Sequence, residues 1–480
     1  MRAWGESIFR GLPSGSLQVV LRKLREHVGM QSSGATFRKY SSAGVNWASW
    51  FLGIGLGLTL ALQVTTMRKS DISSAYAVVA SVSRLAALTG TYFAIVGIFL
   101  VARIPWVERG VGHDRLVTWH RKLGPWSLYL IGAHVLFIIL SFAGQDHVML
   151  IVEMWRMLKQ YDWMWFALLG FVLMIMAGVT SYKKARAKMS YETWWIIHIY
   201  TYVAVAASFM HQVLNGQMFI NHPLNRFYWT SLYVVMALAI IVYRFGIPIV
   251  RSLRHNLVVE KVVVEGPGII SIIMKGRKLH KLAAEGGQFF SWRFLTRGHA
   301  LMSHPYSLSA APTEHYLRIT VKDLGDHSRS VAYLKKGTRV FVEGPYGAFT
   351  AGRATTKHVV LVGGGVGITP VRALMDEFKN GVEIDLLYRV SREEDLVLKD
   401  ELDYLEANSG GTIRIHYLVG SRREYPMDAK ALKALVPRIS DSDIYICGPG
   451  PLVETVKQAV ADLGVPKNRF HDEAFAFHSE

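Results

Sequence analysis

Residues 119–135 read WHRKLGPWSLYLIGAHV and run on into LFIILSFAG, a stretch that predicts a helix crossing a membrane. The stretch also carries two histidines, His120 and His134, fourteen residues apart. An imidazole inside hydrocarbon costs free energy unless its nitrogens find partners, so each ring needs a reason to be there. These two rings, at two depths of one predicted span, decide how the rest of the chain is interpreted.

Apolar residues make up 51% of the 480-residue chain, but they are unevenly spread. Between residues 46 and 250, long apolar runs alternate with short polar breaks, whereas the later sequence has the patterns of a soluble α/β protein. At about 1.5 Å of rise per residue, a helix needs about 20 residues to cross about 30 Å of hydrocarbon. Six segments are long enough: 47–66, 75–102, 117–142, 163–181, 193–214 and 229–250.

Lysine and arginine are unequally distributed between the two sets of predicted loops. The arm 1–45 and the loops 103–116 and 182–192 carry fourteen, whereas the opposite loops carry five. By the positive-inside rule, we expect the arm, both basic loops and the C-terminal half in the cytoplasm, with the spans in the plasma (inner) membrane. The net charge of +18 is partly this topology signal, and no basic stripe with interleaved aromatics indicates nucleic-acid binding. The arm also lacks the apolar core of a cleavable signal.

A second pair of histidines lies in the fifth predicted span, TWWIIHIYTYVAVAASFMHQV, where His198 and His211 are thirteen residues apart. With the N-terminus inside, both spans run outward, so the four rings form two layers about 20 Å apart, each with one ring from each helix. Two facing imidazoles are what a six-coordinate b-type haem requires. Zinc fits less well, because it needs three or four ligands around one point.

The helical phase is less regular than the spacing. At about 100° per residue, fourteen residues return to within about 40° of the starting face, but thirteen land about 140° away. His198 and His211 can therefore serve one stack only if the fifth helix is tilted or irregular, and a π-bulge is the expected repair. A single intramembrane histidine would fit a structural role equally well, but two matching pairs favour haem.

These histidine pairs resemble those of the ferric reductase and NADPH oxidase superfamily, whose members hold two stacked haems on the third and fifth of six helices. The resemblance runs from about residue 47 to the C-terminus. It implies that His120 and His198 hold the inner haem, and that His134 and His211 hold the outer one.

Arg84, in ASVSRLAALTG, lies near the outward end of the second predicted span, where its charge needs an anionic partner. A haem propionate is one candidate, and a side chain that reaches the outer headgroups is the alternative. The resemblance implies a place for Arg84 beside the outer haem, where the final acceptor is reduced, so it is a candidate catalytic residue.

Short alternating strands after residue 255 predict a small antiparallel barrel over about 255–350, closed by EGPYG at 343–347. Within it, HPYSLSAAP begins at residue 304; Tyr306 can stack on a flavin ring and Ser307 can hydrogen-bond its polar edge. The later segment LRITVKDLGDHSRSVA offers a turn for a pyrophosphate. The spacing resembles the flavin domain of the ferredoxin–NADP reductase family, with histidine in place of its usual arginine, as in the oxidase branch. The resemblance implies FAD and these candidate contacts: His304, Pro305, Tyr306, Ser307, Lys322, Gly325 and Ser328.

The segment HVVLVGGGVGITPVRALMDEF, starting at residue 358, predicts a buried strand, a glycine-rich turn and a helix. Such a turn lets the backbone approach a pyrophosphate at a helix N-terminus. Thr369 and Pro370 are typical of the reductase family, and the candidate contacts in the turn are Gly363, Gly364, Gly365 and Gly367. The next strand ends in RVSREED, where Arg389, Ser391 and Arg392 favour a 2′-phosphate and hence NADPH over NADH. The alternative for these three is a solvated loop.

The last strand–turn–helix, IYICGPGPLVETVKQAV, contains the only cysteine. One cysteine excludes an intramolecular disulfide and a cysteine-based metal centre. Cys447, Gly448 and Pro449 resemble the family's Cys-Gly-Pro motif beside the nicotinamide, with a buried, inert thiol. The chain ends FHDEAFAFHSE, in which Glu473 and Phe475 resemble the terminal Glu-x-Phe of the oxidase branch, whose aromatic covers the flavin; Phe477 is the alternative ring.

The expected architecture is multidomain: a six-helix transmembrane bundle, then an antiparallel β-barrel flavin domain and an α/β parallel-sheet nucleotide domain. The expected divisions are an arm over 1–45, a di-haem domain over 46–250, an FAD domain over 251–352 and an NADPH domain over 353–480. The resemblance implies electron transfer from NADPH through FAD and two haems to an acceptor outside the lipid bilayer. Oxygen is favoured over a ferric chelate because His304 and Glu-x-Phe match the oxidase branch. An electron-transfer module that feeds a partner protein or quinone is the second alternative, although the sequence requires no protein partner.

Overall fold

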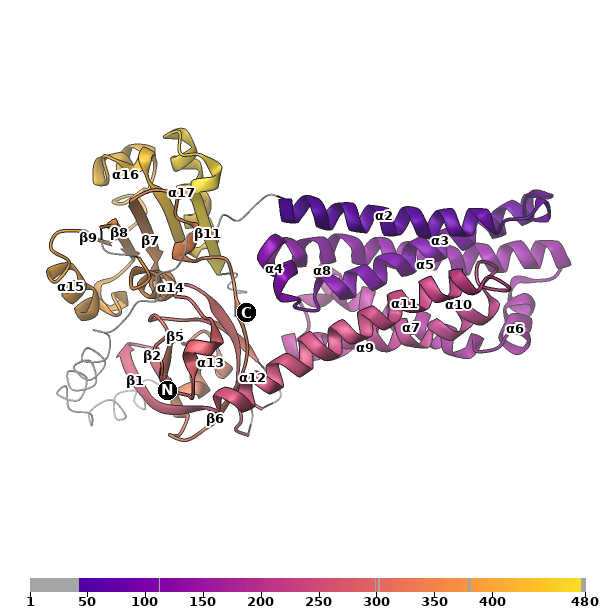
Figure 1. The fold of residues 1–480 in the computed structure, drawn as a ribbon, viewed down its shortest axis with the longest axis horizontal. Coiled ribbons are helices and arrows are strands. Elements are labelled where there is room, and N and C mark those ends of the chain that lie inside the picture. Colours follow the sequence, from indigo (N-terminus) through magenta and orange to yellow (C-terminus); the bar gives the residue numbers. More distant parts are fainter. Residues whose placement is uncertain (1–42, 112, 298, 301–302, 379–380, 476–480) are drawn as a thin grey trace. The chain divides into compact units, whose positions relative to one another are not determined.

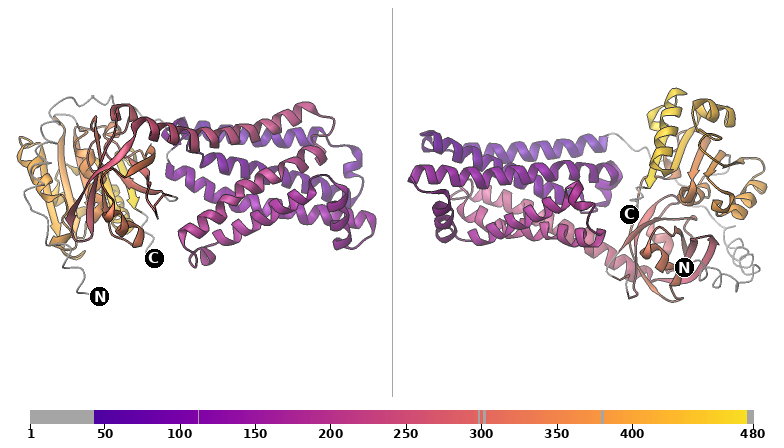
Figure 2. Two further views of the ribbon diagram at one scale, coloured as in Figure 1. Left: turned by 90° about the horizontal axis from the view of Figure 1, so that it is seen from below. Right: turned by 180° about the vertical axis from the view of Figure 1, so that it is seen from behind.

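The computed structural model describes residues 43–475 except 112, 298, 301–302 and 379–380. Most of the predicted basic arm, and Phe477, therefore lie outside the described residues. The chain divides into two compact units between Leu253 and Arg254 (Figures 1 and 2), and each unit is described by itself. The four-segment division predicted from the sequence stays a prediction.

The first unit is a bundle of apolar helices, as the runs of apolar residues predict (Figure 1). Its elements are α2 (Ala43–Thr65), η1 (Lys69–Ile72), α3 (Ala75–Leu100), α4 (Pro105–Val111), α5 (His113–Asp146), α6 (Leu150–Gln160), α7 (Met164–Ser181), α8 (Lys183–Arg186), α9 (Tyr191–Ala207), α10 (Phe209–Asn215), α11 (Pro223–Ala239), the π-helix η2 (Ile240–Gly246) and α12 (Ile247–His255).

Five described helical segments are long and apolar enough to cross a membrane, and they correspond to the second to sixth predicted spans. The first predicted span is a shorter apolar stretch, Ser49–Thr65, within α2. A helical apolar unit is thus confirmed, whereas the predicted count of six spans is not.

Helices α3 and α5 pack closely along their lengths, and Gly90 shows how closely. A Cβ at this position would lie 2.9–3.1 Å from atoms of Leu130 and Ile131 on α5. Only a glycine therefore permits this approach, and it also exposes the Gly90 carbonyl, which accepts a 2.7 Å hydrogen bond from Ser127. The two backbones are close enough for side chains of one helix to bond the carbonyls of the other.

The second unit begins with an antiparallel sheet in the order β4-β3-β6-β1-β2-β5. Its strands are β1 (Leu257–Gly266), β2 (Ile269–Lys275), β3 (Phe289–Phe294), β4 (His304–Ser307), β5 (Tyr316–Lys322) and β6 (Arg339–Tyr346). Alternating apolar residues of these strands form one core, centred on Phe290, Trp292 and Ile319. The edge strands β4 and β5 meet only at a single bridge, Leu308 to Ile319, so the closed barrel is not confirmed. Short helical elements η3 (Leu279–Leu282), α13 (Asp326–Ser330) and η4 (Val331–Tyr333) connect the strands.

A parallel sheet follows, in the order β11-β10-β7-β8-β9. Its strands are β7 (His358–Gly364), β8 (Glu383–Val390), β9 (Ile413–Val419), β10 (Asp443–Pro449) and β11 (Phe470–Phe475), with helices α14 (Ile368–Met375), α15 (Lys399–Ala407), α16 (Ala429–Leu435) and α17 (Gly450–Asp462). Because β7, β8 and β10 are buried on both faces, they are mostly apolar rather than alternating in sequence. Helices α14 and α15 cover one face, and α16 and α17 cover the other.

Candidate functional site: paired histidines in the bundle and a reductase cleft

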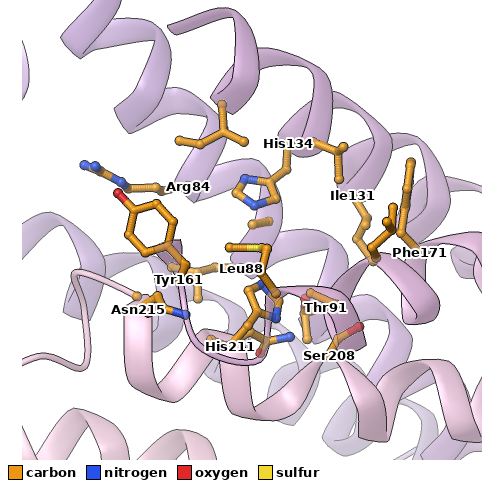
Figure 3. Close-up of a pocket in the computed structure, with 18 of the residues that line it drawn as sticks. Arg84, Leu88, Thr91, Ile131, His134, Tyr161, Phe171, Ser208, His211 and Asn215 are labelled. Carbon is orange, nitrogen blue, oxygen red and sulfur yellow. The ribbon is translucent and has the colours of Figure 1, made fainter. Parts of the chain in front are cut away.

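A cavity of about 330 Å³ lies within the helical unit, and two of the four predicted histidines line it. His134 enters from α5 and His211 from α10, and their rings point into the space from opposite sides (Figure 3). Most other lining side chains are apolar, among them Leu88, Ile131 and Phe171. The volume lies within the range of cofactor pockets, and an apolar lining suits a flat macrocycle.

The other two predicted histidines meet directly. The ring centroids of His120 on α5 and His198 on α9 are 5.9 Å apart, with an angle of 82° between the rings. A metal ion bonded to two facing imidazoles holds their centroids about 6 Å apart, because each metal–nitrogen bond is about 2 Å long. The structure therefore brings the four histidines together as the two predicted pairs.

Both α5 histidines bond to α3 through Nδ1. His120 Nδ1 lies 2.9 Å from the carbonyl oxygen of Gly97, and His134 Nδ1 lies 3.1 Å from that of Ser83. Positions 83 and 97 are fourteen residues apart on α3, as are 120 and 134 on α5, so one antiparallel register satisfies both rings. With Nδ1 occupied, Nε2 is the nitrogen left to face a metal.

The fifth predicted span is interrupted at Ser208, between α9 and α10. The Ser208 hydroxyl donates to the carbonyl of Ala204 at 2.9 Å, as serine does when it bends a helix. The break lies between His198 and His211, where the phase argument calls for an irregularity. The expected π-bulge is thus wrong for this helix: the repair is a break, and the π-helix of the bundle lies in the sixth span, at η2.

The side chains around the cavity fit a planar iron group with polar substituents. Gln63 is 2% exposed and lines the cavity, and its buried Nε2 has no hydrogen-bond partner in the described part of the chain, so a donor is left for an occupant. Within the described ranges, no group of three or more His, Cys, Asp or Glu is placed to hold a metal ion. The structure instead offers pairs of imidazoles, and an iron porphyrin, whose macrocycle supplies four donors itself, can be held by such a pair.

Arg84 lines the same cavity, but its charge already has protein partners. Its Nη1 donates to Gln217 at 2.6 Å and lies 3.4 Å from a carboxylate oxygen of Asp71, and Gln217 Nε2 donates to Asp71 at 2.5 Å. Asp71 therefore balances the charge of the partly buried Arg84 without a propionate. Neither candidate partner considered from the sequence included this carboxylate.

Helix α6 is a part of the site that the sequence analysis did not indicate, because its 11 residues are too few to cross a membrane. Met154, Met157, Leu158 and Tyr161 come from this helix or its C-terminal cap and line the cavity. Its amphipathic pattern, apolar toward the cavity with Arg156 and Lys159 outward, was the available signal.

The predicted flavin contacts lie on β4 and at the end of β5. The rings of His304 and Tyr306 are nearly parallel, 6.3 Å apart at 21°, and burial raises the pKa of Tyr306 to about 12. Pro305 lies between them, and Ser307 is buried at the end of the strand. The two rings form an aromatic face suited to a flat heterocycle.

The predicted pyrophosphate turn follows β5. The hydroxyl of Ser328 accepts from the Leu324 N–H at 2.8 Å and donates to the Gly325 carbonyl at 2.9 Å, so it fixes the turn. Lys322 Nζ lies 3.8 Å from a carboxylate oxygen of Asp395, which follows β8. These residues therefore lie where the two sheets of this unit approach each other.

The glycine-rich turn joins β7 to α14, as predicted, but its glycines have different roles. A Cβ at Gly364 would meet Leu452 at 2.5 Å, and one at Gly367 would meet the carbonyl oxygen of Cys447 at 2.1 Å. Gly363 packs against Ile368. Of these four glycines, only Gly365, with φ of 55° and no described atom within 4 Å of an added Cβ, leaves open space for a ligand. The next two predicted residues, Thr369 and Pro370, are buried in α14.

The three residues predicted to bind a 2′-phosphate are not equivalent. Arg389 is buried at the end of β8, where its Nη1 donates to the carbonyls of Val390 and Leu418. Ser391 is exposed, and Arg392 is 68% exposed while paired with Glu394 and Asp395. Ser391 and Arg392 thus lie on the surface, directly after the end of β8.

The C-terminal motifs come together through the parallel pairing of β10 and β11. Cys447 pairs with Glu473, Gly448 with Ala474 and Pro449 with Phe475. Burial raises the pKa of the Cys447 thiol, which agrees with an inert residue. The backbone of the terminal Glu-x-Phe therefore lies beside the Cys-Gly-Pro turn.

Comparison with protein families gives three consecutive matches. Residues 86–209 match the ferric reductase like transmembrane component, residues 255–350 an FAD-binding domain, and residues 361–458 an oxidoreductase NAD-binding domain. The chain belongs to the ferric reductase and NADPH oxidase superfamily. The matched models describe a transmembrane component followed by a flavin-binding and a nucleotide-binding domain.

Individual relatives match parts of this superfamily member. NADH-cytochrome b5 reductase 1 of Pyricularia oryzae is 32% identical over 34% of the chain and 58% of the relative. The ferredoxin reductase component of the 3-ketosteroid-9-alpha-monooxygenase of Mycobacterium tuberculosis is 29% identical over 39% and 54%. A solved FAD/NAD-binding domain of the nitric oxide dioxygenase from Vibrio cholerae is 25% identical, with a TM-score of 0.38 over 46% of this chain and 99% of that chain. The chain spans between half and two thirds of these two curated relatives.

Proposed function

We propose that the protein carries electrons across a membrane, from cytoplasmic NADPH through FAD and two b-type haems to an acceptor on the far side. The observation that supports it most is the double histidine pair, two rings on α5 and two on α9 and α10. Bound flavin would split a hydride into single electrons, and bound iron porphyrins would pass them on. The carbonyls of α3 orient the two imidazoles of α5, and the apolar side chains of the cavity wall exclude water.

Oxygen, reduced to superoxide, is the acceptor we propose. The cavity beside His134 and His211 is lined mostly by apolar side chains, including those of α6, which suits a small neutral molecule better than a charged chelate. The His304 variant and the terminal Glu-x-Phe agree with the oxidase branch. A ferric chelate is the alternative, and a module that feeds a partner protein or quinone is the second.

The same proposal includes a topology. Six spans, with α2 as the first, place the basic loops around α4 and α8 on the cytoplasmic side of the plasma membrane. The segments 1–45, 46–250, 251–352 and 353–480 would then be the arm, the di-haem domain, the FAD domain and the NADPH domain.

The haem assignment predicts a reduced-minus-oxidised optical spectrum with the sharp bands of low-spin b haems, two per chain. His120→Leu and His134→Leu are each expected to remove about half of the absorbance, because each substitution deletes one ligand of a different pair. Haem quantification with flavin content as the folding control checks this. A fully folded, flavin-loaded protein without porphyrin would refute the assignment.

The acceptor is tested with purified protein, NADPH and either oxygen or ferric citrate. We expect superoxide formation that begins without added iron, measured as superoxide-dismutase-sensitive cytochrome c reduction. Faster ferrous iron production under anaerobic conditions would favour the chelate, and haem reduction without turnover would favour the electron-transfer module.

NADPH selectivity is expected to depend on Arg392. A charge-assisted bond to the 2′-phosphate contributes about 1.5–3 kcal/mol, so Arg392→Ala should raise KM for NADPH about tenfold to hundredfold. KM for NADH should stay unchanged, because NADH lacks the phosphate. Arg438→Ala, an exposed arginine that pairs with Glu383 at the start of β8, is the matched control and should affect neither value.

A further inference from the structure

The four paired histidines differ in what holds Nδ1, the nitrogen that faces away from a metal. On α5, both rings have backbone carbonyl partners from α3, at 2.9 Å for His120 and 3.1 Å for His134. His134 Nδ1 also lies 3.0 Å from the Ser83 hydroxyl, whose proton can go to the carbonyl of His134 at 3.0 Å. The α5 rings are therefore fixed by the tightest helix pair in the bundle.

The rings of α9 and α10 have weaker supports. His198 Nδ1 lies 3.3 Å from the hydroxyl of Ser181, and that oxygen also accepts from the indole N–H of Trp194 at 3.1 Å. His211 Nδ1 is buried and has no hydrogen-bond partner among the residues that the structure describes. The Ser208 backbone interacts with the His211 ring, but no bond of normal geometry reaches Nδ1.

A hydrogen bond from the outward nitrogen of an imidazole fixes the ring and makes the other nitrogen a stronger donor to a metal. Losing such a partner typically costs about tenfold to hundredfold in metal affinity. The four rings rank by their Nδ1 partners. His120 and His134 have backbone carbonyls, and His198 has a shared hydroxyl. His211 has only the contact with the Ser208 backbone, which is not a hydrogen bond of normal geometry.

We propose that the two pairs are built from unequal ligands, and that His211 is the weakest of the four, so that its coordination position is the exchangeable one. Because carbonyls of α3 fix His134, this ring would stay bound to the haem that it shares with His211. A small neutral donor, for which imidazole is the probe, would take the place of the His211 ring. This inference deepens the proposed function and rests on its haem assignment.

The test compares alanine substitutions at the two histidines of one pair in the full-length protein. His211→Ala is expected to keep close to two haems per chain, one of them high-spin, and added imidazole should restore the low-spin spectrum. His134→Ala is expected to keep about one haem. Haem content by pyridine haemochrome and spin state by electron paramagnetic resonance are the readouts, with flavin content as the folding control.

Ser181→Ala supplies a test that deletes no ligand. It removes the Nδ1 acceptor of His198, so the inner haem should dissociate about tenfold more readily and its midpoint potential should rise. Ser231→Ala, whose hydroxyl bonds only within α11, is the matched control and should change neither property.

The outcomes separate this inference from the function on which it rests. A wild-type protein without haem would defeat the haem assignment itself. Two haems in the wild type, with equal haem loss in the two alanine variants or greater loss in His211→Ala, would overturn only the ranking. If His134→Ala does not fold, an unchanged haem affinity and potential in Ser181→Ala would overturn it as well.

Discussion

Replacing Glu401 with glutamine is expected to destabilise the nucleotide-binding unit by about 3–5 kcal/mol, the usual consequence of breaking a buried ion pair. Glu401 on α15 accepts from Arg318 of β5 at 2.9 Å and also pairs with Arg372 of α14. Its side chain is only 15% exposed. Without the carboxylate, Arg318 would lose its anionic partner and Arg372 would keep only Asp376, at 2.7 Å. The substitution would also loosen the contact between the two sheets.

The same carboxylate makes stability depend on pH. Burial alone would raise the pKa of Glu401, but Arg372 and Arg318 outweigh burial and hold the pKa at about 2. A group whose pKa is lowered on folding stabilises the protein above its unfolded value, about 4.5, and this stabilisation is lost as pH falls toward 2. Denaturation of the wild type should therefore become easier between these values, and Glu401→Gln should flatten that dependence.

The measurement is urea unfolding of the full-length protein, with the release of bound flavin as the signal that reports unfolding. Glu454→Gln is the control, because Glu454 is 72% exposed and pairs with Lys457 within one helix. An exposed pair of this kind contributes less than about 1 kcal/mol. Equal midpoints for the two variants would show that the buried network does not hold the sheets together.

Most of the successful predictions about the fold came from local sequence patterns. Apolar runs and glycine-rich turns are contiguous features, so the helical unit, the antiparallel and parallel sheets and the histidine-bearing helices followed from them. The phase of His198 and His211 even required an irregularity between them. Its form, a break at Ser208, depends on how α7 and α9 pack: a Cβ at Gly170 would lie 2.4 Å from the Ser208 hydroxyl oxygen.

Features built from distant segments could not be predicted in this way. The carbonyls of Ser83 and Gly97 become partners of the α5 histidines only through the register of two antiparallel helices, and every residue has a carbonyl. Glu401 meets Arg318 and Arg372 only after two sheets have packed. The sequence of helix α6 shows an amphipathic pattern, but its contribution to the cavity wall depends on how the helix packs against the rest of the bundle.

Gly367→Ala is expected to be the most damaging single methyl addition in the nucleotide turn. The new Cβ would lie 2.1 Å from the carbonyl oxygen of Cys447, 2.6 Å from its carbon and 2.9 Å from the Gly448 nitrogen. All three atoms belong to the backbone of β10, which pairs with β7 and β11, so they cannot move without shifting the sheet. We expect a loss of about 3 kcal/mol or more in the free energy of unfolding, together with a loss of flavin reduction by NADPH.

Gly365→Ala separates this packing effect from backbone strain. Gly365 has φ of 55°, and no atom of the described residues lies within 4 Å of an added Cβ, so alanine there should cost only the left-handed conformation, about 1–2 kcal/mol. Urea unfolding and NADPH-driven flavin reduction measure both variants. If Gly365→Ala were as unstable as Gly367→Ala, conformational freedom rather than close packing against β10 would explain why glycine occupies this turn. If instead Gly365→Ala stays folded but binds NADPH poorly, we would conclude that the added methyl group occupies the space that the pyrophosphate needs.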